Sequence, residues 1–166
     1  DEIGRAAGLR AVERLNPRRP ATGNYPVIYD ERISSGLVGH FLSAINGAAI
    51  TRGSSWLKDS LGEQVLPRTC KLVENPHRVR TGASRLFDSE GLTTKTREIL
   101  SKGVLNGWTL DLASSRKLGM RPTGNASRSV SSNPSPTNWN IELSSPEDYC
   151  NDLLSEMRNG LLVTSL

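Results

Sequence analysis

One amphipathic helix constrains this 166-residue chain more than any other feature of its sequence. Asp30 is a good N-cap, and Glu31 lies in the first turn, where the positive end of the helix dipole favours an acidic side chain. Apolar residues then recur at helical spacing and fill one half of the helix surface: Ile33, Leu37, Val38, Phe41, Leu42 and Ile45. The sequence therefore predicts a helix over residues 31–45 that buries this face.

Size and charge are those of a globular domain. A chain of this length buries roughly 70% of its unfolded surface if it forms one core. The net charge of +4 and the pI near 9.4 invite a nucleic-acid hypothesis. However, the basic residues alternate with acidic ones, and the few aromatic residues form no stacking pattern. We interpret the charge as a solvated surface, which disfavours nucleic-acid binding.

The two cysteines and the lengths of the apolar runs indicate in which cellular compartment the protein is expected. Cys70 and Cys150 lie far apart and have no metal-like spacing, so we expect reduced thiols in a cytoplasmic protein. No run approaches the roughly 20 apolar residues that a membrane span needs. We therefore expect no membrane partner.

The two ends of the sequence suggest a piece of a longer protein. The chain starts at Asp1 rather than at a methionine, and residues 160–166 form an apolar, strand-like run that is expected to pair with another strand. Pro17 and Pro20 end a helix over residues 1–15. We predict that residues 1–22 are a helix end and linker from a preceding domain, and that residues 23–166 form one domain truncated at its C-terminal end.

Further elements follow from local patterns along the chain. Strands are expected at 25–29, 66–73 and 139–143, loops at 47–55, 75–91 and 121–138, and a short helix at 56–64. A hairpin over 96–111 turns either at Asn106-Gly107 or earlier, at Lys102-Gly103. A helical turn at 113–118 ends at Gly119, and residues 145–148 (SPED) start a last helix that ends at Asn159-Gly160.

The predicted helix over residues 31–45 contains a segment that resembles a known metalloprotease motif without the residues that perform its chemistry. Residues 31–45 are similar to a segment of the TldD/PmbA family, in which PmbA is also called TldE. The TldD branch carries His-Glu-x-x-x-His here; this chain has Ser35 and Gly36 at the first two positions and keeps only His40. That chemistry needs two neutral imidazoles on a metal and a carboxylate to accept a proton from the bound water. The resemblance implies the PmbA-like, metal-free branch.

Five further blocks resemble the family in order and spacing, and with the motif they cover the chain from about residue 25 to its end. They are 58–65, 87–91, 102–105, 115–119 and 122–126. The resemblance implies an α+β fold with a mainly antiparallel β core and flanking helices, within a larger two-domain protein. It also implies a TldD–PmbA heterodimer that degrades unfolded peptides in the bacterial cytoplasm. Family members are described, in addition, as modulators of DNA gyrase and processors of microcin precursors.

The resemblance carries over few site residues. Ser43 stands where the metal-bearing branch has an acid, and four residues fall in family blocks as candidates for a peptide groove: Asp88, Glu90, Thr123 and Asn125. Their simpler role is turn chemistry, with Asx-type hydrogen bonds around Gly91 and a bend at residues 123–125.

The spacing of the family motif sets a geometric condition. Residues five apart on a regular α-helix point roughly 140° away from each other, so two histidines at this spacing share a metal only on a distorted helix, such as one with a π-bulge. Gly36 and Gly39 are consistent with an inherited irregular backbone, or alternatively with tight helix packing. We expect His40 to be partly buried and bonded to a backbone carbonyl.

Three functions follow from these observations. The first is a non-metal-binding subunit of a peptidase, with no catalytic or metal-binding residue of its own. Its TldD-like partner subunit holds the zinc ion, and the substrate is an unfolded or extended peptide. The second is an enzyme that uses either a metal on His40, His77 and carboxylates or a nucleophile such as Ser35. It is disfavoured because the sequence has neither metal-ligand spacing nor a nucleophile elbow. The third is a module that binds DNA gyrase or nucleic acid without proteolysis.

Overall fold

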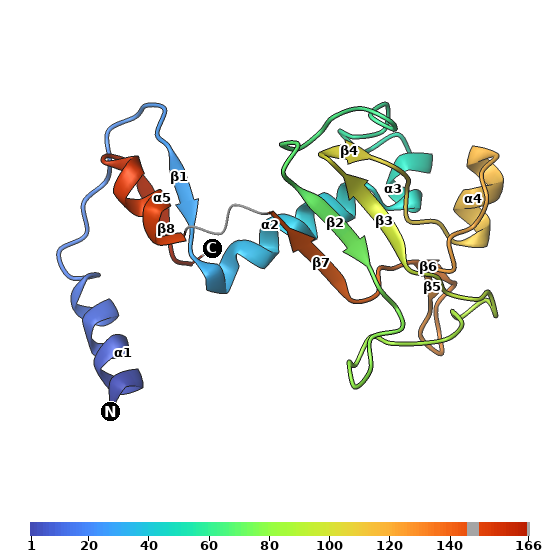
Figure 1. Ribbon diagram of the computed structural model, residues 1–166, viewed down its shortest axis with the longest axis horizontal. Helices are drawn as coiled ribbons and strands as arrows, with labels where there is room; N and C mark the ends of the chain where they lie inside the picture. Colours follow the sequence, from blue (N-terminus) through green and yellow to red (C-terminus); the bar gives the residue numbers. More distant parts are fainter. Residues whose placement is uncertain (146–149, 166) are drawn as a thin grey trace.

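The computed structural model describes residues 1–145 and 150–165 (Figure 1). Its helices are α1 (Glu2–Val12), α2 (Glu31–Ala44), α3 (Gly47–Thr51), α4 (Leu112–Leu118) and α5 (Cys150–Met157). Its strands are β1 (Val27–Tyr29), β2 (Lys71–Glu74), β3 (Arg97–Ser101), β4 (Val104–Leu105), β5 (Ala126–Ser127), β6 (Ser135–Pro136), β7 (Ile141–Ser144) and β8 (Leu161–Val163). The fold is α+β with an antiparallel sheet and flanking helices, which confirms the expected fold class.

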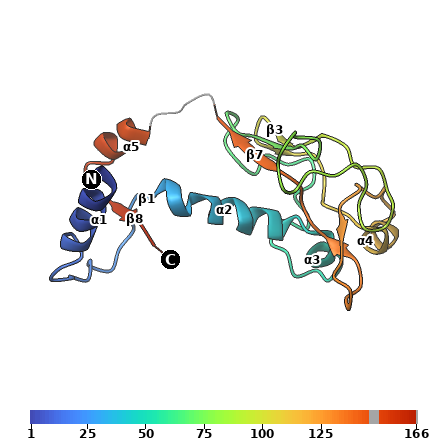
Figure 2. The same ribbon diagram turned by 90° about the horizontal axis from the view of Figure 1, so that it is seen from below.

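The main sheet has the strand order β4-β3-β2-β7, and all its neighbours are antiparallel. Figures 1 and 2 show α2 running along this sheet. Phe41 and Ile45 of α2 belong to the same core cluster as the sheet residues Leu72, Leu100 and Leu105. The sheet and α2 therefore form two packed layers around one core.

Helix α2 agrees with the sequence prediction. The Asp30 carboxylate accepts a hydrogen bond from the Arg32 amide at 3.0 Å and so caps the helix. Phe41 and Ala44 are buried within the helix, and Ile45 is buried just after it. The predicted apolar face is confirmed for the second half of the helix, where Val38 and Leu42 also pack against the core, whereas Leu37 remains 44% exposed.

The elements near the two ends of the chain lie together, away from the main sheet (Figure 1). β1 pairs with β8 in parallel, with Ile28 opposite Leu162. The strands expected at 25–29 and near the end of the chain are thus confirmed, and they pair with each other. α1, expected within residues 1–15, forms with no buried residue. The predicted domain boundary between residues 22 and 23 stays a prediction.

Residues 47–64 differ from the sequence prediction. The expected loop at 47–55 contains helix α3, because the Asn46 side chain accepts a hydrogen bond from the Ala48 amide and caps it. The expected helix at 56–64 is a series of turns. Its start is held by the buried Ser55 hydroxyl, which donates to the Ala44 carbonyl and accepts from the Leu57 amide. These tertiary contacts override the local helical pattern.

The hairpin turns at its earlier candidate position. β3 and β4 are joined through Lys102 and Gly103, which both have positive φ, and Gly103 donates to the Cys70 carbonyl at 3.0 Å. The prediction that the hairpin turns at Asn106-Gly107 is therefore wrong. Asn106 instead uses its side-chain amide to bond the Glu98 carbonyl.

Other boundaries are shifted or lie outside the described residues. The strand expected at 66–73 is shorter and ends one residue later, at Glu74. The expected loop 121–138 contains the short ladder of β5 and β6. Helix α4 ends at Gly119 with φ 64°, as predicted. Of the expected start of α5 at 145–148, residues 146–148 lie outside the described residues. In the described part of the chain, no helix has the length and apolarity needed to cross a bilayer.

Candidate functional site

The four positions of the degenerate motif lie on the exposed side of α2. Ser35, Gly36, His40 and Ser43 are all exposed, and the Ser43 hydroxyl donates to the Gly39 carbonyl within the helix at 2.9 Å. The expectation that His40 is partly buried is wrong, because one residue step of about 100° turns it away from the buried Phe41. Within the described residues its ring takes part in no hydrogen bond.

The backbone of α2 is a regular α-helix over its whole length. The expected irregular backbone at the two glycines is therefore wrong for this helix. The alternative explanation, that the glycines allow tight helix packing, is wrong too, since a Cβ at Gly36 or Gly39 would meet no described atom within 4 Å. The glycines leave this side of α2 smooth and uncovered in the described structure.

The first groove candidate, Asp88, is a buried carboxylate that organises a turn. Its Oδ1 accepts hydrogen bonds from the amides of Glu90 and Leu92, both at 2.9 Å. Its Oδ2 accepts from the Ala126 amide at 2.9 Å. Gly91, with φ 78°, closes the turn. The bonds to Glu90 and Leu92 are the expected Asx-type turn chemistry, and the bond to Ala126 in addition ties the turn at residues 88–92 to strand β5.

Glu90 and Thr123 both hold the segment that leads into α4. Glu90 Oε2 accepts from the Leu112 amide at 2.8 Å, at the first residue of the helix. The Thr123 hydroxyl contacts both the amide and the carbonyl of Leu110, at 2.9 and 3.0 Å. Asp111 completes the helix start in a capping box with Ser114.

Asn125 belongs to a buried polar network that the sequence analysis missed. Its Nδ2 donates to Glu74 Oε1 at 2.9 Å and to the Thr137 carbonyl at 2.8 Å, whereas its buried Oδ1 has no partner among the described residues. Glu74, only 1% exposed, also accepts from the Trp139 amide and from Arg97. The burial of Glu74 could have been predicted from the alternation of side chains along a strand, because Glu74 lies two residues after the apolar Leu72 and so faces the same side.

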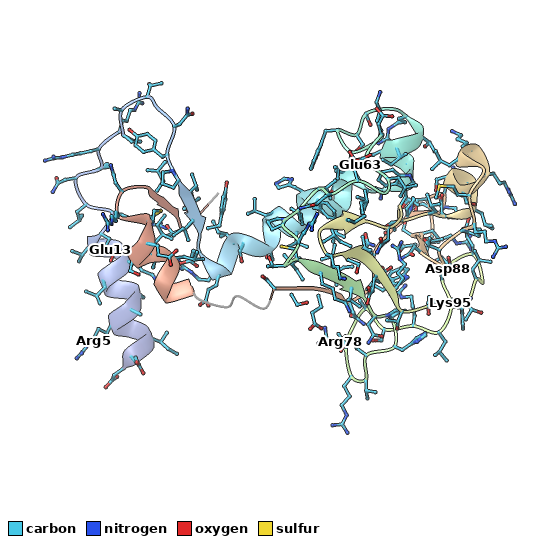
Figure 3. The ribbon with its side chains drawn as sticks, turned by 45° about the horizontal axis from the view of Figure 1, so that its top comes forward. Arg5, Glu13, Glu63, Arg78, Asp88 and Lys95 are labelled. Atoms are coloured by element: carbon cyan, nitrogen blue, oxygen red, sulfur yellow. The ribbon has the colours of Figure 1, made fainter. Side chains whose placement is uncertain are left out.

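The four groove candidates therefore come together around residues 110–126, and Figure 3 shows the part of the molecule that carries Asp88 and Lys95. Asp88 borders a surface hollow of about 550 Å³ that also contacts Phe87, Arg128 and Val130. Thr123 borders another, of about 460 Å³, with Lys95 and Arg97. Among the described residues, no hydrogen bond or ion pair links these candidates to the exposed side of α2.

Comparison with known proteins identifies the family. Residues 22–166 match the model of the PmbA/TldA metallopeptidase C-terminal domain. The chain is 38% identical over 164 residues to metalloprotease PmbA of Escherichia coli O157:H7, covering 99% of this chain and 34% of that protein. This chain belongs to the PmbA/TldD (TldE) family.

Two solved structures share the fold. One is a candidate modulator of DNA gyrase from Bacteroides thetaiotaomicron, with TM-score 0.82, 28% identity, and coverage of 98% of this chain and 35% of that one. The other, a protein of the same description from Thermotoga maritima, has TM-score 0.79, 30% identity, and coverage of 99% and 37%. The chain spans about a third of the length of these relatives.

The residues on α2 do not fit the metal that the family's name implies. The positions of the motif offer one imidazole, two serine hydroxyls and a glycine, and one of those hydroxyls is bonded to the helix backbone. Zinc sites in proteins use at least three side-chain ligands, usually imidazole, thiolate or carboxylate. Within residues 1–145 and 150–165, no three His, Cys, Asp or Glu side chains lie close enough together to hold a metal ion.

Proposed function

We propose that the full-length protein is the non-metal-binding, PmbA/TldE-like subunit of a heterodimeric metalloprotease that degrades or processes unfolded peptides. A TldD-like partner supplies the zinc ion and the general base. In this proposal the present chain contributes no catalytic residue and no cofactor, and it helps to form the chamber that holds an extended peptide. The proposed compartment is the cytoplasm, which the free thiol of Cys70 supports.

The observation that carries this proposal is the side-chain chemistry on the exposed side of α2. Family members are called metalloproteases, yet Ser35 and Gly36 offer neither an imidazole nor a carboxylate next to His40. A lone exposed imidazole does not hold zinc against water. A family scaffold that lacks the residues for hydrolysis has a role if a second subunit carries them, and the family relation is part of this argument.

The test is to purify the full-length protein without a histidine tag, together with its TldD-like relative from the same organism. We expect light scattering to show a heterodimer of the two proteins. Only the TldD-like relative should contain zinc, and only the mixture should cleave an unfolded peptide. A His40→Ala variant should leave zinc content and cleavage unchanged. The proposal fails if the relative alone is fully active and the two do not associate at micromolar concentration, or if this protein holds close to one zinc per chain.

A second function has a specific observation in its favour. Both solved relatives are described as candidate modulators of DNA gyrase, and this chain has a net charge of +4. A gyrase-associated or nucleic-acid-binding role without proteolysis is therefore the alternative. Retention of DNA that falls steeply between 50 and about 200 mM salt would favour it, because binding to phosphates releases counterions.

A further inference from the structure

Strand β7 is an edge strand with one side free. It pairs with β2 along one side, and no described strand pairs with its other side. Figure 1 shows β7 at the margin of the main sheet, facing the part of the molecule that carries the two ends of the chain. Free edges expose unpaired backbone amides and carbonyls, and natural proteins cover or blunt such edges.

The register identifies which backbone groups are free. The Asn75 amide donates to the directly opposite Asn140 carbonyl at 3.1 Å, so this pair is a hydrogen-bonded one. Such pairs alternate with non-bonded pairs along an antiparallel ladder. Counting along the register, Glu142 and Ser144 bond to β2, whereas the amides and carbonyls of Ile141 and Leu143 point to the free side.

An apolar groove lies beside the same edge. Its volume is about 220 Å³, and its lining consists of aliphatic and aromatic side chains and one thiol: Leu37, Val38, Phe41, Leu66, Cys70, Leu72 and Leu143. Leu143 is 45% exposed and Leu37 44%, so both leave apolar surface in contact with water. Added strands in other proteins gain affinity from the backbone ladder and specificity from alternate side chains that enter pockets.

We propose that a β-strand from the part of the full-length protein outside this chain pairs with β7 through Ile141 and Leu143. Its apolar side chains, at alternate positions, cover the groove. The length of the relatives supports this occupant, since this chain spans only about a third of them. The lining supports it as well, because a groove without a charged side chain is typical of permanent contacts rather than of transient ones. This inference is independent of the proposed peptidase role.

The test is residue-resolved hydrogen–deuterium exchange on the full-length protein, with no peptide added. We expect the amides of Ile141 and Leu143 to exchange on the order of 100-fold more slowly than open amides, as slowly as the Glu142 amide, at every protein concentration. Glu142 is the internal control because the register directs its backbone amide toward β2. Fast exchange at 141 and 143 beside slow exchange at 142 would overturn the proposal.

Two other outcomes would also overturn it, each by identifying a different occupant. Protection that appears only above a certain protein concentration would assign the edge to a second copy of the protein. Protection that appears only after addition of reduced, carboxymethylated protein as an unfolded substrate would assign it to peptide.

A pair of variants tests the groove separately. In a Cys150→Ser background Cys70 is the remaining cysteine of this sequence, so labelling of that position by a thiol reagent reports on the groove. We expect Leu143→Lys to raise its labelling rate at least about tenfold by displacing the covering strand, whereas the matched control Glu142→Lys leaves it unchanged. Equal, fast labelling of Cys70 in the parent protein and in both variants would show that nothing covers the groove.

Discussion

Glu74 and Arg97 face each other across β2 and β3, with Arg97 Nε 2.5 Å from Glu74 Oε2. The Arg97 guanidinium also donates to the Trp108 carbonyl and to the Thr109 hydroxyl. The pair thus connects the sheet to the segment that leads into α4. Since Glu74 is almost fully buried, its charge is compensated by this pair and by its other hydrogen bonds.

Glu74→Gln should therefore destabilise the full-length protein strongly. The substitution removes the buried charge that pairs with the partly buried guanidinium of Arg97 and disturbs the hydrogen bonds that Glu74 accepts, which costs about 3 kcal/mol of the free energy of unfolding. The matched control is Glu142→Gln on the neighbouring strand, whose partner Arg78 is exposed and 3.6 Å away. Urea unfolding of the two variants checks this, and similar losses in both would contradict the assigned role of the pair.

Gly103→Ala should disrupt the β3–β4 hairpin. Gly103 has φ 75°, and a Cβ there would clash with the Leu66 carbonyl oxygen, so we expect the free energy of unfolding to fall by at least about 2 kcal/mol. Gly107→Ala is the control at the other candidate turn, where a Cβ meets no atom within 4 Å and φ is not in the left-handed region. Thermal unfolding should separate the two variants. If Gly107→Ala proved the more damaging, the turn would lie at the later position.

The start of α2 should respond to acid at unusually low pH. The side-chain hydrogen bond from Arg32 lowers the pKa of Asp30 to about 2 from an ordinary value of 3.8. A lowered pKa stabilises the fold above pH 3.8, and this contribution is lost as the pH falls toward 2. Titration of the Asp30 carboxylate by NMR should show this pKa, and Arg32→Gln should move it back toward 3.8. No difference between the two proteins would show that Arg32 is not the cause.

Restoring the family motif should not restore a protease. Ser35→His with Gly36→Glu supplies the missing side chains, and a Cβ at position 36 would meet no described atom within 4 Å. However, α2 is regular, so imidazoles at positions 35 and 40 point about 140° apart, and Ser43 still lacks a carboxylate. We expect no stoichiometric zinc by elemental analysis and no peptide cleavage. Robust cleavage that a chelator abolishes would show that α2 distorts readily enough to bind the metal.

The sequence alone determined the features that repeat over several turns or carry their own stop signal. The apolar residues of α2 fix its buried face because each residue turns the chain by a constant angle. Asp30 and Gly119 mark the start of α2 and the end of α4 by local hydrogen bonding and backbone conformation. The family resemblance also rests on ordered local blocks, which is why it could be recognised before the fold was known.

Only the tertiary structure decided the features that depend on residues far apart in the chain. The hairpin turn lies at Gly103 rather than at Gly107 because Leu66 and Cys70 contact the earlier position. Glu74 is buried because Arg97 and Asn125 approach it from distant segments. Local sequence does not encode which distant group satisfies a charge or occupies a turn, since these contacts exist only once the layers have packed.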